Sequence, residues 1–302
     1  MRSDRFVSSC PSHLCRFAGR ALAATLLAVA FCAPAMAQSV APSMCQAVAQ
    51  ALPGARFASV LPPLAPTHTP LRRVATAAER EVVITFVGHS TYRIETPGGV
   101  VIATDYSGYG GNGPVPTVVT MNHAHTSHFT NSPDPGIEQV LRGWNPDGGH
   151  AEHHLVVGDV LIRNVTTDIR TWDGGFEPEG NSIFIFEVAD LCIGHLGHLH
   201  QVLEDDHIAL IGRLDVVMVP VDGGYTMNRT NMINVIERLR SSVIIPMHWF
   251  SGYALTQFLD EIGTTFAVEQ TGQPSLEVSL RDLPPQPTIM VLQPRYLSDA
   301  TD

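Results

Sequence analysis

The 302-residue sequence contains no lysine, so arginine supplies all 18 basic side chains, and 29 acidic residues outnumber them. The absence of lysine carries no functional argument alone, but the acidic excess does. Nucleic acids and anionic membrane surfaces are bound through basic residues that neutralise phosphates. The charge balance therefore argues against nucleic acid as a partner, and we expect a small-molecule substrate.

Long apolar runs are scarce, and one stands near the N-terminus. Four arginines precede or flank the run "ALAATLLAVAFCAPA" (residues 21–35), and Ala35 and Ala37 follow the small-residue pattern of a cleavage site. This order is typical of a secretory signal peptide. A membrane anchor is the alternative, but spanning a bilayer takes about 20 apolar residues. We expect cleavage after Ala37, a periplasmic or secreted protein, and no stable membrane insertion.

Cysteine is rare outside that segment, since only Cys45 and Cys192 follow it. An oxidising compartment permits a bridge between them. However, Cys192 lies in the apolar run "LCIG", where a buried free thiol is the common outcome. Spacing cannot decide between the two. We expect free thiols, with a disulfide as the alternative.

The sequence predicts a lead-in at residues 38–80 and one domain at 81–302. The lead-in holds a short helix over 43–53 and an extended proline-rich segment over 61–73. In the domain, β-branched runs predict strands, with one hairpin turning at "TPGG" and another at Ala189-Asp190. Helices are predicted over 137–143, 227–242 and 252–263. Strand-rich halves with added helices indicate an α/β fold, an αββα sandwich of two mixed sheets with outer helices.

Histidines gather where predicted strands end. The stretch "MNHAHTSHFTN" places His123, His125 and His128 directly after one strand. Side chains alternate along an extended segment, so His123 and His125 are expected to point the same way. One helical turn would then bring His128 back toward them. An exposed polar loop is an equally weighted alternative, because such motifs have false positives. His198 and His248 end two further strands, and His89 in "VGHS" ends a fourth, which favours one shared metal site.

Four motifs, "TMNHAHTSH", "CIGHLGHLH", "VMVPVDGGYTM" and "VIIPMHWF", resemble in order and spacing those of the metallo-β-lactamase superfamily of hydrolases. The opening "VGHSTYRIETPGGVVIATD" resembles its lactonase-like branch, which includes the ascorbate-6-phosphate lactonases. The resemblance covers about residues 81–250. It implies the sandwich fold and a metal-dependent hydrolase.

The resemblance also implies a ligand set, with departures. His123, His125 and His128 match the family's H-x-H-x-D-H, but Ser127 stands where that motif has aspartate. The aspartate that bridges two metals in the family corresponds to His198.

Three further positions follow from the resemblance. The family's last histidine ligand matches His248, and Asp105 matches an aspartate that orients a ligand. No histidine stands where the family has its middle one, and Asp168 is the available substitute. We therefore expect four residues to contact the metal ligands without binding the ion themselves: His89, Asp105, Ser127 and Asp168.

These departures predict one metal ion instead of two. Two adjacent divalent ions need anionic ligands, and an imidazole has one free lone pair, so His198 cannot bridge. Three imidazoles and a water form a known catalytic zinc arrangement, in which the pKa of the water falls to about 7. We expect one divalent transition-metal ion, zinc first, although copper, nickel and iron suit the same ligands.

The sequence-based hypothesis is an exported hydrolase whose metal-bound hydroxide attacks an ester, lactone or phosphoester. Asp222, after the strand "VMVPV", is the candidate to handle protons, and its alternative is a turn residue before two glycines. The rival hypothesis is a catalytically degenerate protein of the same fold that binds metal or a small ligand, since function follows the site. A purely structural role is disfavoured, because five convergent imidazoles would repel one another when protonated.

Overall fold

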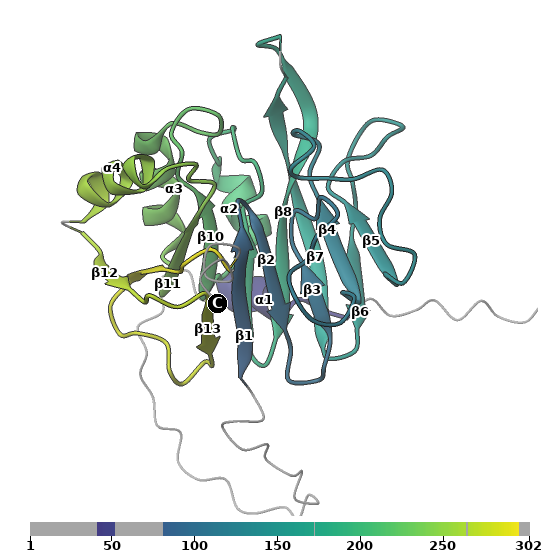
Figure 1. Cartoon of the computed structure of the whole chain (residues 1–302), viewed down its shortest axis with the longest axis horizontal. Helices are drawn as coiled ribbons and strands as arrows, with labels where there is room; N and C mark the ends of the chain where they lie inside the picture. The colour runs from purple at the N-terminus through teal and green to yellow at the C-terminus, as the bar shows by residue number, and fades with distance from the viewer. Residues whose placement is uncertain (1–40, 52–80, 172, 264, 296–302) are drawn as a thin grey trace, which may run out of the picture. The chain divides into compact units, whose positions relative to one another are not determined.

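Two mixed β-sheets form the frame of the computed structural model, which describes residues 41–51, 81–171, 173–263 and 265–295 (Figure 1). The expected signal peptide and the proline-rich segment lie outside the described residues. One sheet has six strands in the order β13-β1-β2-β3-β4-β5. Its strands are β1 (Val82–Gly88), β2 (Thr91–Glu95), β3 (Val101–Ala103), β4 (Val118–Met121), β5 (Gln139–Arg142) and β13 (Ser275–Val278).

The other sheet has eight strands in the order β12-β14-β11-β10-β9-β8-β7-β6. They are β6 (His154–Val157), β7 (Val160–Arg170), β8 (Phe176–Val188), β9 (Leu191–His195), β10 (Val216–Pro220), β11 (Val243–Met247), β12 (Ala267–Gln270) and β14 (Thr288–Val291). The described helices are α1 (Met44–Ala51), α2 (Asp205–Ile211), α3 (Arg229–Leu239) and α4 (Gly252–Ile262).

Apolar side chains from both sheets pack into one core between them, with Phe86 and Ile94 from one sheet and Phe184 from the other fully or almost fully buried. The helices bury residues such as Met232 and Phe258 against the outer face of the eight-stranded sheet. The predicted class, a sandwich of two mixed sheets, is confirmed. In the described residues the helices cover only one sheet, and a small cluster around Met121 packs on the outer face of the other.

Strand direction brings the histidines together. Strands β9, β10 and β11 are parallel neighbours, so their carboxyl ends lie at one edge of the larger sheet. The pairings from β1 through β4 make those two strands run the same way in the smaller sheet. The backbone N–H of His248 donates to the carbonyl of His89 over 2.7 Å and joins these two edges.

The predicted hairpins are confirmed, and one helix prediction is wrong. Ala189 and Asp190 have φ angles of 52° and 67°, as a tight two-residue hairpin turn requires. Residues 137–143 were expected to be helical because their apolar positions recur every three or four residues. Instead, Gln139–Arg142 forms β5 and pairs with β4, so pairing at the sheet edge overrides local periodicity.

The expectation of free thiols is also wrong, because Cys45 and Cys192 form a disulfide with Cα atoms 6.0 Å apart. The bridge fastens α1 to β9. The carboxylate of Glu187 fixes the start of α1, accepting from the Ser43 hydroxyl (2.6 Å) and from the backbone N–H of Met44 (2.8 Å). Sequence spacing could not show that a helix 147 residues away would dock beside Cys192.

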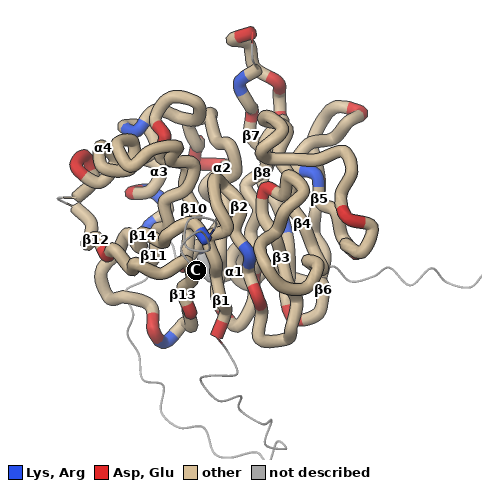
Figure 2. The backbone as a smooth tube through the Cα atoms, in the orientation of Figure 1, with Lys and Arg blue, Asp and Glu red and all other residues tan. Residues whose placement is uncertain are grey.

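The surface of the described chain agrees with the acidic composition. Figure 2 shows acidic positions spread over many loops and helix ends, with arginines between them. Within the described ranges, no helix is both long enough and apolar enough to cross a bilayer.

Candidate metal centre

Four histidines converge at the shared edge of the two sheets. Each of His89, His125, His128 and His248 offers a ring nitrogen, and these four atoms lie within 4.8 Å of one another. Nε2 of His128 is 3.2 Å from Nε2 of His89 and 3.2 Å from Nε2 of His248. Two nitrogens bound to one tetrahedral zinc ion at about 2.0–2.1 Å lie about 3.3 Å apart, so this spacing fits a shared ion.

Buried carboxylates set the orientation of two of these rings. Asp105 Oδ2 lies 2.7 Å from Nδ1 of His128, and Asp222 Oδ2 lies 2.9 Å from Nδ1 of His248. An ionised carboxylate accepts, so each Nδ1 carries the proton and each Nε2 keeps its lone pair. Both lone pairs are thus available at the point where the rings meet, which is the arrangement typical of metal-bound histidine.

The backbone at this site is also unusual. His89, Asp105 and His248 have φ angles of 56°, 43° and 59°, in the left-handed region that residues other than glycine rarely adopt. Such conformations persist only where the surrounding structure fixes them, and they concentrate at functional sites. The turn at His89 sends its ring toward the cluster, whereas the sequence had placed His89 only around the ligands.

His198 lies against the cluster without belonging to the four-residue group. Its ring centroid is 4.7 Å from that of His128, 4.8 Å from that of His248 and 5.0 Å from that of His125. It is 4 % exposed, and neither ring nitrogen has a hydrogen-bond partner. Buried polar atoms are almost always paired. The two ring nitrogens of His198, unpaired and buried among other imidazoles, therefore support a bound cation at this position.

Replacing His198 with leucine should separate stability from function. Each buried polar atom without a partner costs about 1–3 kcal/mol. We expect the free energy of unfolding of the metal-free protein to rise by about 1–3 kcal/mol, and metal affinity to fall. His153→Leu is the matched control, because its ring Nε2 bonds the Arg142 carbonyl over 2.7 Å and its loss should destabilise. Urea denaturation of both variants tests this, and a less stable His198→Leu protein would contradict it.

The structure does not bring His123 to the cluster. Its Nδ1 lies 2.7 Å and 2.9 Å from the two carboxylate oxygens of Glu177, and its ring stacks on Trp144 with centroids 4.9 Å apart. The prediction that His123 points the same way as His125 requires the strand to continue through both residues. Strand β4 ends at Met121, so strand alternation does not apply there.

The remaining predicted residues fall into two groups. Ser127 touches the cluster, since its Oγ is 2.7 Å from Nδ1 of His125 and 3.0 Å from Nε2 of His89. Asp168 does not. It occupies an irregularity in the pairing of β7 with β8, where its carboxylate accepts from the backbone N–H of Glu179.

Asp222 holds a loop and a histidine instead of standing free to move protons. One carboxylate oxygen accepts from the backbone N–H groups of Gly224, Tyr225 and Thr226. The other accepts from the Thr226 hydroxyl and from His248. Burial raises the pKa of Asp222, but hydrogen bonds from His248 and Thr226 lower it more, so the net pKa lies well below its usual range. These hydrogen bonds support a positioning role for Asp222, and its proton-handling role stays a prediction.

Burial and mutual repulsion favour the neutral form of His89 and His125. Burial, followed by the charges of His248 and His128, lowers the pKa of His89 to about 3. Burial and the charge of His128 lower the pKa of His125 to about 4. Burial raises the pKa of Asp105, but His128, His195 and a hydrogen bond from His128 bring it down to about 2. His89 and His125 are therefore neutral in the metal-free protein, and the Asp105 carboxylate behind the cluster is ionised.

The metal-free protein should lose stability in acid. A histidine whose pKa is lower in the folded state binds a proton more readily when unfolded. Its stabilising contribution is complete above the unfolded pKa of about 6.5 and is lost as pH falls toward the folded pKa, about 3 for His89. Each such histidine costs at most about 1.4 kcal/mol per pH unit in that window. Thermal melts of chelator-treated protein between pH 7.5 and 4.5 check this, and unchanged or rising stability toward pH 4.5 would contradict it.

Several residues behind the site carried no clear sequence signal. Asn122 donates to Asp105 Oδ1 over 2.8 Å and accepts from the backbone of Ser182. Asn181 accepts from the backbone N–H of His198 over 2.8 Å. Gly197 has a φ of 62°, and a Cβ there would lie 2.4 Å from both asparagine side chains, so only glycine fits between them. The position of Asn122 directly before His123 in "TMNHAH" is the sequence feature that indicates this role.

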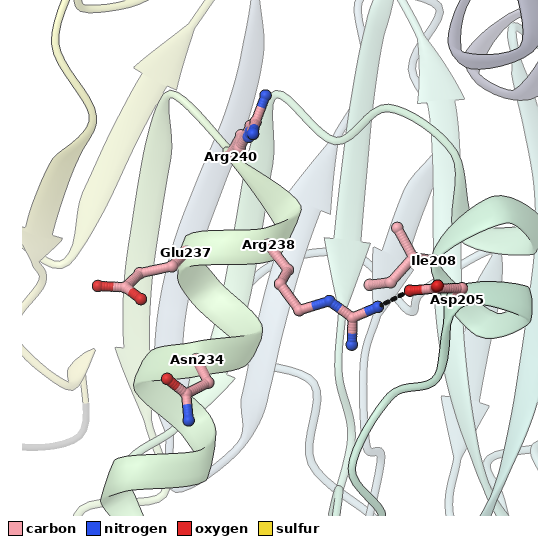
Figure 3. A pocket seen from close by; sticks show the side chains of 6 residues that line it. All are labelled: Asp205, Ile208, Asn234, Glu237, Arg238 and Arg240. Carbon is pink, nitrogen blue, oxygen red and sulfur yellow. Dashed lines mark hydrogen bonds and ion pairs between the residues drawn. The ribbon is translucent and has the colours of Figure 1, made fainter. Parts of the chain in front are cut away.

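A separate hollow of about 590 Å³ lies between α2 and α3 (Figure 3). Its lining residues are Asp205, Ile208, Asn234, Glu237, Arg238 and Arg240. Arg238 pairs with Asp205 across it. None of the six is a residue of the histidine cluster, so this hollow is not part of the candidate site.

Comparison with known proteins points to one family. Residues 83–248 match a family model described as a β-lactamase superfamily domain. A UPF0173 metal-dependent hydrolase of Nanoarchaeum equitans is 23% identical over 182 residues, which are 55% of this chain and 83% of that protein. Another UPF0173 metal-dependent hydrolase, from Polaromonas, is 27% identical over 224 residues, covering 58% of this chain and 80% of that protein.

A solved structure from Thermotoga maritima matches with a TM-score of 0.50 and 27% identity. The match covers 70% of this chain and all of that chain, which is named provisionally as a Zn-dependent hydrolase of the metallo-β-lactamase superfamily. The residues matched by the family model begin in β1 and end at His248, so they include the whole four-histidine cluster.

Proposed function

Because the chain belongs to the metallo-β-lactamase superfamily, we propose that it is an exported hydrolase that depends on one divalent transition-metal ion, zinc. Its substrate is an ester, lactone or phosphoester of a small molecule. The observation that carries this proposal is the central position of His128, whose Nε2 lies 3.2 Å from Nε2 of His89 and 3.2 Å from Nε2 of His248. The names of the relatives support hydrolysis, and the lactonase-like opening motif supports an ester or lactone.

The residues present fit a single ion. His89, His125, His128 and His248 would hold it, and the unpaired nitrogens of His198 offer a fifth lone pair beside them. No carboxylate belongs to the described ligand group, which disfavours a second cation. Such an ion, when bound, supplies a hydroxide nucleophile at neutral pH and polarises the bond under attack.

Side chains behind the cluster fix the orientation of the histidine rings. Asp105 and Asp222 hold the protonated Nδ1 atoms of His128 and His248 and so keep both Nε2 lone pairs directed inward. The Ser127 hydroxyl holds Nδ1 of His125 at 2.7 Å. Phe250 packs on His248 with ring centroids 4.8 Å apart.

Metal removal tests the activity directly. The purified protein is assayed on an ester, a lactone and a phosphodiester, then treated with chelator, and then resupplied with zinc, manganese, cobalt or iron. We expect hydrolysis of at least one substrate class, its loss with chelator, and its return with zinc. Tight metal binding with no hydrolysis of any class would favour the degenerate, ligand-binding alternative.

Export is proposed on separate grounds. The basic and apolar N-terminal pattern precedes Ala37, and the disulfide between Cys45 and Cys192 suits an oxidising compartment outside the cytoplasm. N-terminal sequencing of protein from its natural host should begin at Gln38. A mature protein that retains Met1 would contradict export by this route.

A further inference from the structure

A cavity of about 670 Å³ opens beside the histidine cluster. His125 and His198 form the wall toward the cluster, and Ala124, Gly224, Tyr225 and Phe250 form much of the remainder. Sites for drug-sized organic molecules typically measure about 300–1,000 Å³. The cavity therefore has room for a substrate group much larger than an acetyl group.

Two aromatic side chains give the cavity an apolar character. Tyr225 is 67% exposed and Phe250 is 58% exposed, and their rings meet edge to face with centroids 5.3 Å apart. Phe250 also lies 5.1 Å from the ring of His89. A large apolar side chain exposed between a candidate metal centre and a cavity is better explained by a ligand than by packing in the core.

The cavity offers little to an anion. Arg170 is the one charged residue among those that line it, apart from the histidines. The Nη2 group of Arg170 donates to the carbonyls of Gly224, Tyr225 and Thr226 and so fastens the loop after β10. Away from the histidine wall, a charged group on the acyl part of a substrate would therefore meet no free cationic side chain among the lining residues, which is costly.

We propose that the substrate is an uncharged ester or lactone with a medium-length aliphatic or aromatic acyl group, which lies against Phe250 and Tyr225 while the reacting carbonyl faces His125 and His198. This inference rests on the proposed hydrolase function and narrows it, because it excludes charged phosphoesters as the preferred class. Phe250, Tyr225 and Gly224 are then the residues that determine specificity.

A chain-length series of p-nitrophenyl esters tests the proposal, with bis(p-nitrophenyl) phosphate as the anionic comparison. Each methylene buried should raise kcat/KM about fourfold from acetate through butanoate to hexanoate. The phosphodiester should react at least 100-fold more slowly than hexanoate. Phe250→Ala should lower kcat/KM for hexanoate by about 10- to 100-fold and flatten the chain-length series, because hexanoate loses a contact that acetate does not reach.

Two variants sharpen the result. A Cβ at Gly224 would meet no atom within 4 Å, so Gly224→Leu should fold normally, fill part of the cavity and penalise hexanoate at least tenfold more than acetate. Tyr253→Ala is the matched control, because Tyr253 is 71% exposed on α4 and does not line the cavity. It should leave the chain-length series unchanged.

The outcomes separate this inference from the proposed function. Metal-dependent ester hydrolysis with a flat chain-length series, or with faster cleavage of the phosphodiester, overturns the inference and leaves the function intact. If no ester is cleaved, calorimetry with acetamide, butanamide and hexanamide replaces the kinetic series. Tighter binding of the longer amides, lost in Phe250→Ala, then supports the cavity assignment, and equal binding overturns it.

Discussion

Replacing His128 with alanine is expected to weaken zinc binding by about 100- to 1,000-fold. Zinc held by four protein ligands is bound with about 10–16 kcal/mol, or roughly 2.5–4 kcal/mol for each ligand. His128 is the central ring, because its Nε2 lies 3.2 Å from those of both His89 and His248. Competition with a chelating dye at pH 7.5 measures the change, and hydrolysis should fall with it.

Two further variants make that result specific. Asp105→Asn keeps the histidine but removes the charge that holds its proton, so a smaller loss of about 10- to 100-fold is expected. His207→Ala removes a histidine whose ring accepts from the backbone of Glu204 at the start of α2, away from the cluster, and should leave affinity unchanged. Equal losses in His128→Ala and His207→Ala would show that the cluster is not the metal site.

Replacing Cys45 with serine is expected to lower the free energy of unfolding by about 2–5 kcal/mol. The disulfide closes a loop across 147 residues, and a long closed loop restricts the unfolded chain strongly. For a domain of this size the melting temperature should fall by on the order of 10 °C. Scanning calorimetry under non-reducing conditions measures it.

Met44→Ala is the control for that variant, since Met44 is the neighbouring residue on α1 and its side chain is 60% exposed. It should melt within about 2 °C of the parent, as surface substitutions usually change stability by less than 0.5 kcal/mol. If reductant lowered the melting temperature of the Cys45→Ser protein as much as that of the parent, the loss could not come from the bridge.

Much of the fold could be predicted because the relevant signals are local. The turn "TPGG", the turn at Ala189-Asp190 and the apolar strand "VVMVP" each specify their own structure, and each was placed correctly. The exception is β5. A seven-residue segment with apolar residues three and four apart fits a helix, and only pairing with β4 makes it a strand.

The sequence predicts that histidines form the site, but it predicts less well which histidines belong to the cluster. The expected convergence of His125, His128 and His248 is confirmed, since they follow β4 and β11, one strand from each sheet, and their ring nitrogens lie in one group. The two differences, His89 inside the cluster and His123 outside it, both depend on backbone conformation beyond a strand end. A φ of 56° turns His89 inward, and Glu177 on β8 holds His123 away. Neither is encoded in spacing along the chain.

Metal stoichiometry tests the central claim most directly. The protein is incubated with excess zinc, freed of unbound ion by gel filtration and analysed for zinc and for protein. The arrangement of neutral imidazoles with no carboxylate in the ligand group predicts one zinc ion per chain. Two ions at full occupancy would contradict the argument that a second cation is excluded, and none would contradict the metal centre itself.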